Sequence, residues 1–284
     1  MASDTHTRTP SIIDLNAELA ALTMFRRTPE ATAAERRGSV AQLASYRDGL
    51  LLAIKAAGKD HWERHLTGDE LIHILDGTAV LEIVCDDGPP QSFGLRPGMM
   101  AVIPQGAWHR FQSSDGITQI AVTPFPGELI ERDIDDPRGP EGAPAGQSTT
   151  PPGIVDLDAE LAKLTTFRGR TPQTTITDRQ GTAARLASYR DGALTATRFA
   201  GMGHWEMHPA DELIHVIDGT ATLDIVCDEG PPKPFMLYAG TLAVIPQGVW
   251  HRFHSSGGTT LMTATPFHGE TIALDIADPR EVGR

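Results

Sequence analysis

The chain of 284 residues consists almost entirely of two copies of one unit of more than a hundred residues. Asp69–Pro89 aligns without a gap with Asp211–Pro231, and 16 of the 21 positions are identical. Val102–Phe111 and Val244–Phe253 share 9 of 10 residues. Such a unit is much longer than the roughly 20 to 50 residues of a solenoid repeat. We therefore expect each copy to fold as a domain with its own hydrophobic core.

A segment rich in proline and glycine separates the two copies. It runs from Pro137 to Gly153 and contains few apolar side chains, which is typical of a linker. The sequence therefore predicts a first domain at residues 1–138, a linker at 139–152 and a second domain at 153–284.

Within each copy the pattern of apolar residues is mostly that of short strands. Asp14–Leu22 has a candidate N-cap and leucines at helical spacing, so a short helix should open the first copy. After it, apolar runs alternate with turn signals such as Arg47–Gly49, Arg96–Gly98 and Pro104–Gly106. This punctuation predicts an all-β fold: two tandem antiparallel β-barrel or jelly-roll domains, each with a short N-terminal helical segment.

The charge balance excludes several classes of partner. The 24 lysines and arginines against 37 aspartates and glutamates give a formal net charge of −13, which repels nucleic acid and anionic membrane surfaces. No apolar stretch reaches the ~18 to 20 residues of a membrane-spanning helix, and the first residues lack the pattern of a secretory signal. We expect a cytoplasmic protein whose partner is a small molecule. An anionic ligand remains compatible, since a metal supplies local positive charge.

The histidines indicate where the chemistry lies. Eight of the 11 form four repeat-related pairs: His61 with His204, His65 with His208, His73 with His215, and His109 with His251. On a strand, side chains alternate between faces, so His61, Glu63 and His65 should share one face. A short turn then brings Glu70 back toward the same side. The second copy repeats the arrangement at His204, Glu206, His208 and Glu212.

Two runs of residues resemble the two motifs of the cupin superfamily. The first copy matches at His65, Glu70 and Gly77, where a strand should end in a turn, and then at Gly98, Pro104, Gly106 and His109. The second copy matches at His208, Glu212, Gly219, Gly240, Pro246, Gly248 and His251. Because both copies match, the chain resembles a bicupin. It departs from the family pattern at Glu63 and Glu206, where a histidine is customary, and at Ser113 and Ser255, where an asparagine is customary.

The resemblance implies one divalent metal site in each copy. The implied ligands are His65, Glu70 and His109 in the first copy and His208, Glu212 and His251 in the second. Two imidazoles and a carboxylate with open positions suit Fe(II), and such mixed sets also accept Mn, Ni or Zn. Glu63 and Glu206 are candidates for an additional ligand or for a catalytic base. Their carboxylates would make the sites harder, which favours Mn or Fe over Cu.

The remaining conspicuous residues have simpler interpretations. His61 and His204 either line a substrate pocket or lie at its rim. His73 and His215 lie three residues after the glutamates, hence on the opposite face, and are interpreted as structural. Trp62, Trp108, Trp205 and Trp250 also face outward and should pack against a neighbouring sheet or subunit. Cys85 and Cys227 fit small buried apolar positions, while Gln42, Met100 and Phe111 are candidates for the pocket lining.

Two functional hypotheses follow. The first is a metal-dependent enzyme of the dioxygenase, decarboxylase or isomerase type that acts on a small oxygen-rich metabolite. The alternative is a small-molecule binding or sensing module without catalysis, which would account for the altered first motif. The barrel itself hosts many functions and does not separate the two. The sequence also leaves open whether the chain forms a homo-oligomer.

Overall fold

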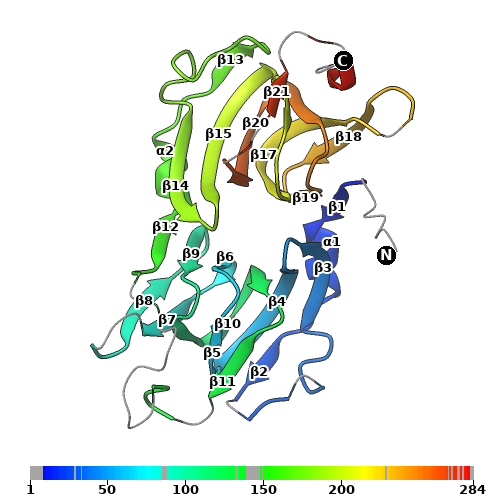
Figure 1. Cartoon of the computed structure of the whole chain (residues 1–284). Helices are drawn as coiled ribbons and strands as arrows, with labels where there is room; N and C mark the ends of the chain where they lie inside the picture. The colour runs from blue at the N-terminus through cyan, green and yellow to red at the C-terminus, as the bar shows by residue number, and fades with distance from the viewer. Residues whose placement is uncertain are drawn as a thin grey trace. The chain divides into compact units, whose positions relative to one another are not determined.

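The computed structural model describes residues 9–281 except 29, 33, 85–87, 132–133, 139–147, 149, 228, 268, 270, 274–275 and 277. Cys85 and most of the predicted linker lie outside the described residues. The chain divides into two compact units (Figure 1). We call Asn16–Glu160 the first barrel, and Met1–Leu15 together with Leu161–Arg284 the second barrel.

The first barrel is organised around one long strand, β10 (Trp108–Pro124). On one edge β10 pairs with β4 (Gly49–Lys59) and β5 (Trp62–His65), and on the other with β6 (Glu70–Gly77) and β7 (Ala79–Val84). Helix α1 (Leu15–Ala21) leads into this barrel. The other strands of its 11-stranded sheet are β2 (Phe25–Arg27), β3 (Val40–Tyr46), β8 (Gln91–Leu95), β9 (Met99–Ile103), β11 (Glu128–Glu131) and β12 (Gly153–Asp156).

The second barrel repeats this plan around β20 (His251–Pro266). Its neighbours are β15 (Gly192–Met202) and β16 (Trp205–Met207) on one edge and β17 (Glu212–Ile225) on the other. The remaining elements are β1 (Ser11–Asp14), α2 (Leu157–Ala162), β13 (Phe167–Arg170), β14 (Ala183–Tyr189), β18 (Lys233–Tyr238), β19 (Thr241–Ile245), β21 (Thr271–Ala273) and a 3-10 turn at Pro279–Glu281.

The predicted fold class is confirmed, because both units are β-barrels and a short helix opens each sequence copy. The strand pairs are antiparallel apart from β2 with β4 and β13 with β15, which are parallel among the described residues. Gly77 ends β6, as expected, but its counterpart Gly219 lies inside β17. Both adopt a φ of 77°, and a Cβ there would collide with the facing strand.

The first strand of each sequence copy belongs to the barrel of the other copy. Strand β1 pairs with β19 in the second barrel, and β12 pairs with β9 in the first barrel. The compact units therefore change over at the two helices, near Leu15 and Glu160. The predicted division at 1–138, 139–152 and 153–284 describes the sequence copies, and as a domain division it stays a prediction.

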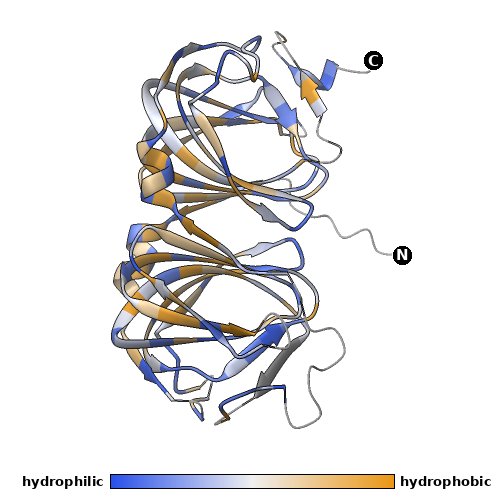
Figure 2. Ribbon diagram, turned by 90° about the vertical axis from the view of Figure 1, so that its left-hand side faces the viewer, coloured by the Kyte–Doolittle hydropathy of each residue, from blue (hydrophilic) through white to orange (hydrophobic). Residues whose placement is uncertain are grey.

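Each barrel has an apolar interior built by alternation along the strands, and Figure 2 shows hydrophobic residues recurring along them. On β6, Ile72 and Ile74 belong to the core of the first barrel. Ile214 and Val216 hold the same places on β17 in the second barrel. Glu70 and Glu212 stand two residues before these core positions, so alternation directs their carboxylates into the barrel interiors.

The tryptophans form small apolar clusters of their own. Trp62 and Trp108 are buried together with Val84, and Trp205 packs with Val226 and Trp250. The indole Nε1 of Trp62 donates a hydrogen bond to the carbonyl of Ile134 (3.2 Å). These contacts lie within each barrel, and packing of the tryptophans against a neighbouring sheet or subunit stays a prediction. Among the described residues, no helix has the length and apolar character needed to cross a bilayer.

Candidate metal centres

Three strands bring the predicted ligands of the first barrel together. Glu63 and His65 come from β5, Glu70 begins β6, and His109 is the second residue of β10. The backbone of Glu63 lies opposite that of His109 in the sheet. The turn that delivers β10 is fixed by Gly106, which has a φ of 82° and whose N–H donates to the carbonyl of His65 (2.8 Å).

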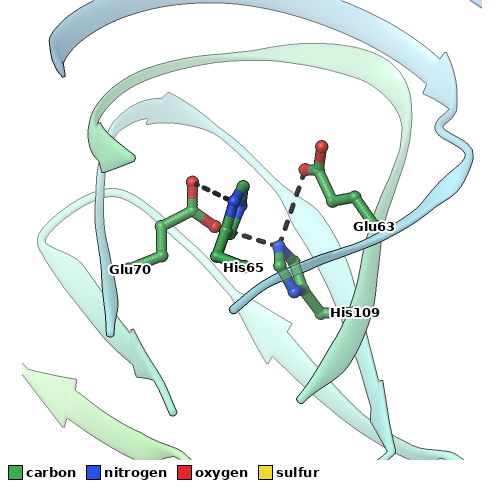
Figure 3. A group of neighbouring side chains, drawn as sticks. All are labelled: Glu63, His65, Glu70 and His109. Carbon is green, nitrogen blue, oxygen red and sulfur yellow. Dashed lines mark ion pairs between the residues drawn. The ribbon is translucent and has the colours of Figure 1, made fainter. Parts of the chain in front are cut away.

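The four side chains point toward one another in the barrel interior (Figure 3). His109 Nε2 lies 2.9 Å from Glu70 Oε2 and 3.5 Å from Glu63 Oε1, and His65 Nε2 lies 3.6 Å from Glu70 Oε1. One ligand atom from each residue falls within a span of 4.8 Å. His65, Glu70 and His109 are buried, while Glu63 retains 17% of its side-chain exposure. Glu63 is therefore the most exposed of the four side chains.

Two hydrogen bonds orient the cluster from behind. Thr123 donates from Oγ1 to Glu70 Oε1 (2.6 Å), and this leaves Oε2 facing His109. Nδ1 of His109 lies 3.1 Å from the carbonyl oxygen of Ala107, which selects the tautomer protonated at Nδ1 once Nε2 is needed as a ligand. Outer partners of this kind commonly fix metal-binding histidines and carboxylates.

The cluster fits a divalent metal. Both ring nitrogens of His65 are buried and make no hydrogen bond within the described part of the chain, whereas Oε2 of Glu70 and Nε2 of His109 face each other as an ion pair. Leaving such atoms without a partner costs free energy, and a cation that accepts their lone pairs would remove that cost. Two imidazole nitrogens with carboxylate oxygens suit Fe, Mn, Ni or Zn.

The charges of the metal-free cluster are strongly coupled. Burial opposes ionisation of Glu63, but polar contacts with His109 and His61 hold the pKa of its carboxyl well below its usual range. Burial likewise opposes ionisation of Glu70, yet the charge of His65 and contact with His109 lower its pKa to about 2. Burial disfavours the charged imidazole of His109, whereas Glu63 and Glu70 raise its pKa to about 10. A metal ion must therefore displace a proton from His109 to bind.

The second barrel repeats the cluster with Glu206, His208, Glu212 and His251. Nε2 of His251 lies 3.0 Å from Glu212 Oε2 and 3.7 Å from Glu206 Oε1, and Nε2 of His208 lies 3.7 Å from Glu212 Oε2. Thr265 donates to Glu212 Oε1 (2.5 Å), and His251 Nδ1 lies 3.0 Å from the carbonyl oxygen of Val249. Despite opposing burial, contact with His204 and the charge of His251 lower the pKa of Glu206 to about 2.

Comparison with known proteins assigns this architecture to a family. A family model described as "Cupin domain" matches residues 199–265. This segment contains all four cluster residues of the second barrel. The first sequence copy repeats that segment residue for residue at most positions and forms the same cluster. The second barrel therefore contains a cupin domain, and the repeated sequence and cluster of the first barrel are consistent with a second one. No curated protein sequence matches it.

Two solved structures are similar to this chain, and the first of them supports the same fold. A "Cupin 2 conserved barrel domain protein" from Leptotrichia buccalis is 12% identical, with 92% of this chain and 96% of that chain covered and a TM-score of 0.51. The structure of oxalate decarboxylase from Bacillus subtilis at pH 4.6 is 12% identical, with 82% of this chain and 73% of that chain covered and a TM-score of 0.48. At these identities the likeness concerns the fold alone.

His61 and His204, which lie beside the clusters, differ in burial between the two barrels. His61 is buried, and its Nε2 lies 3.3 Å from Glu63 Oε2 while its Nδ1 lies 3.3 Å from Asp60 Oδ1. His204 approaches Glu206 Oε2 in the same way (3.4 Å) but is half-buried and lines a cavity. Of the two, His204 occupies the predicted pocket position, and His61 lies enclosed behind Glu63.

That cavity opens over the second cluster and has a volume of about 620 Å³. Glu206 and Glu212 form its floor together with His204. Its walls include four threonines of β15 and β20, three arginines and several apolar side chains: Thr195, Thr197, Thr263, Thr265, Arg170, Arg179, Arg185, Phe199, Phe253, Leu261 and Phe267. Cavities of this size commonly hold small organic ligands.

Most other candidates from the sequence belong to the protein interior or surface. Alternation places His73 on the face of β6 opposite to Glu70, and burial lowers its pKa to about 4. Met100 is fully buried, Phe111 packs in the core of the first barrel, and Gln42 is exposed. Cys227 is half-buried beside the second core.

The sequence interpretation missed the orienting threonines and the arginines of the second cavity. Thr123 and Thr265 carried a signal, because they occupy equivalent positions in the two copies, 53 residues after the cluster glutamates. Arg170 also carried a signal, because aligning the two copies shows that Gly203 stands where the first copy has Asp60.

Proposed function

We propose that this bicupin is a metal-dependent enzyme that acts on a small oxygen-rich metabolite, with one divalent cation held by each His/Glu cluster. The observation that carries the proposal is the repeated group of two imidazoles and two carboxylates, whose ligand atoms lie within 4.8 Å of one another and which a threonine and a backbone carbonyl orient. His65, Glu70 and His109 would hold the ion in the first barrel, and His208, Glu212 and His251 in the second.

The second carboxylate of each cluster, Glu63 or Glu206, makes the donor set harder than two imidazoles and one carboxylate alone. Hard oxygen donors favour Mn or Fe over Cu. A bound ion of this kind polarises a substrate oxygen or activates dioxygen, which is compatible with dioxygenase, decarboxylase or isomerase chemistry.

The protein's own groups would supply proton transfer. Glu206 directs Oε1 toward His251 and Oε2 toward His204, so it connects the cluster with a histidine at the cavity wall. We assign to this pair the transfer of a proton between the ligand and Nε2 of His204. In the first barrel His61 is enclosed, and the equivalent transfer would run from Glu63 through His61 to Asp60.

The alternative function is binding or sensing without catalysis. It is favoured by the first barrel, in which the equivalent histidine, His61, is buried between Asp60 and Glu63. The two functions differ in whether a metal-loaded chain turns over a substrate.

Elemental analysis of the full chain, expressed with added Fe, Mn, Ni or Zn, tests the proposal first. We expect about two metal ions per chain, and their loss in the His65→Ala/His208→Ala variant. The matched control is His73→Ala/His215→Ala, which removes buried histidines from the faces of β6 and β17 opposite to Glu70 and Glu212 and should keep the metal. A chain without metal under every condition refutes the proposal. A metal-loaded chain that neither consumes oxygen nor converts any of a panel of diketones, catechols and carboxylates supports the binding module.

A further inference from the structure

Equivalent arginines of the two barrels differ in whether they form an ion pair with a carboxylate. In the first barrel Arg27, on β2, forms an ion pair with the buried carboxylate of Asp60. In the second barrel the equivalent residue is Arg170, on β13, and the position of Asp60 is taken by Gly203. A Cβ at Gly203 would lie 3.3 Å from Arg170 Nη2, so the missing carboxylate would have stood beside this guanidinium.

Arg170 consequently lines the cavity with no ion pair to a carboxylate among the described residues, although the charge of Glu206 acts on it, and its guanidinium lies over the ring of Phe199 (4.7 Å). Burial, and then the charge of nearby Arg179, lower the pKa of Arg170 to about 10, so the group remains charged at neutral pH. Arg179 lines the same cavity, and its Nε is buried without a hydrogen-bond partner in the described part of the chain. Two adjacent unpaired guanidinium groups form a site for an anion, because their mutual repulsion is relieved when a carboxylate lies between them.

The cavity walls also differ from their counterparts in the first barrel. Where the second barrel has Thr195, Thr197 and Thr263, the first has Leu52, Ile54 and Ala121. The hydroxyl of Thr263 lies 2.8 Å from those of Thr195 and Thr265, and Thr265 donates to Glu212. A row of hydroxyls therefore leads along one wall to the metal cluster, whereas Phe199, Phe253 and Leu261 supply apolar surface.

We propose that the second barrel binds one organic carboxylate with an apolar body per chain, its carboxylate held by Arg170 and Arg179, and that the first barrel does not. The inference rests on the proposed function, since it names the class of small molecule that the second site takes. The apolar body packs against Phe253 and Leu261, and polar substituents face the threonines. A single negative charge is preferred over two, because Glu206 and Glu212 line the same cavity.

The test is isothermal titration calorimetry on the full chain, metal-free and Mn-loaded, with 3-phenylpropanoate and its neutral amide as probes. We expect about one carboxylate per chain and at least about tenfold weaker binding of the amide, because a charge-assisted hydrogen bond is lost. Arg170→Gln and Gly203→Asp should each weaken 3-phenylpropanoate binding at least about tenfold. Gly203→Asn adds the same bulk without the charge, and Arg168→Gln removes an exposed arginine of β13 that does not line the cavity. Both controls should retain wild-type affinity.

Equal affinity for the acid and the amide, two carboxylates per chain, no binding at millimolar concentration, or equal effects of Gly203→Asp and Gly203→Asn overturns the inference. Circular dichroism of each variant shows whether it is folded. Selective carboxylate binding by a chain that takes up no metal would refute the proposed function and leave this inference standing. Metal uptake without carboxylate binding would refute this inference and leave the proposed function standing.

Discussion

Thr123 donates a hydrogen bond to Oε1 of Glu70 (2.6 Å), and this contact determines which oxygen of the carboxylate faces the other ligands. Oε2 then lies 2.9 Å from His109 Nε2. Thr265 and Glu212 stand in the same relation in the second barrel (2.5 Å). Each site therefore has a carboxylate held in one orientation before any ion arrives, which limits the conformational entropy lost on binding.

Thr123→Val should weaken metal binding at the first cluster by about 10- to 100-fold, the usual effect of removing an outer hydrogen-bond partner. Valine keeps the shape of threonine and removes only the hydroxyl. The affinity can be measured by chelator competition in a His208→Ala background, which leaves one functional cluster. Thr118→Val on the same strand is the control, because the side chain of Thr118 is buried but belongs to neither cluster. Equal affinities for the two variants would contradict the orienting role of Thr123.

The cluster residues could be predicted from the sequence because their positions are set locally. Strand alternation puts Glu63 and His65 on one face, and the turn at Gly106 delivers His109 in register with Glu63. The strand exchange could not be predicted. Ser11–Asp14 and Gly153–Asp156 have similar patterns and meet equivalent sheet edges, so nothing in either pattern distinguishes the two pairings. The ion pair of Arg27 with Asp60 joins residues 33 positions apart, which no local period reveals.

The metal-free first barrel should be most stable between about pH 4.5 and 6.5. The pKa of His109 rises from 6.5 to about 10 on folding, so its contribution is complete below pH 6.5 and is lost as the pH rises through about 10. The pKa of Glu70 falls from 4.5 to about 2, so its contribution is complete above pH 4.5 and is lost as the pH falls through about 2. Urea unfolding of the metal-free chain across this range measures the effect. If the free energy of unfolding increased from neutral to alkaline pH, and did so equally in His109→Asn, then His109 and Glu70 would not control its pH dependence.

Asp60→Asn should lower the free energy of unfolding of the first barrel by about 3 kcal/mol, because it leaves the guanidinium of Arg27 buried without its counter-charge. Asparagine preserves the size of the side chain, so the loss measures charge rather than packing. The double variant Arg27→Met/Asp60→Asn removes both charges and should recover most of the stability. Denaturant unfolding with a probe in the first barrel checks this. A double variant no more stable than Asp60→Asn would mean that the residues act independently.

Ile13→Ala, in the first sequence copy, should loosen the barrel that carries the second metal cluster. Ile13 is buried on β1, opposite Leu242 of β19. Truncating a buried isoleucine commonly costs about 2 to 4 kcal/mol. Hydrogen exchange should therefore accelerate at the amides of Thr241–Ile245, while those of Met99–Ile103 keep wild-type protection. Val155→Ala on β12 is the reciprocal variant, since Val155 lies opposite Met100, and it should accelerate exchange in β9 alone. If each substitution instead loosened the barrel of its own sequence copy, the first strands would not be exchanged in solution.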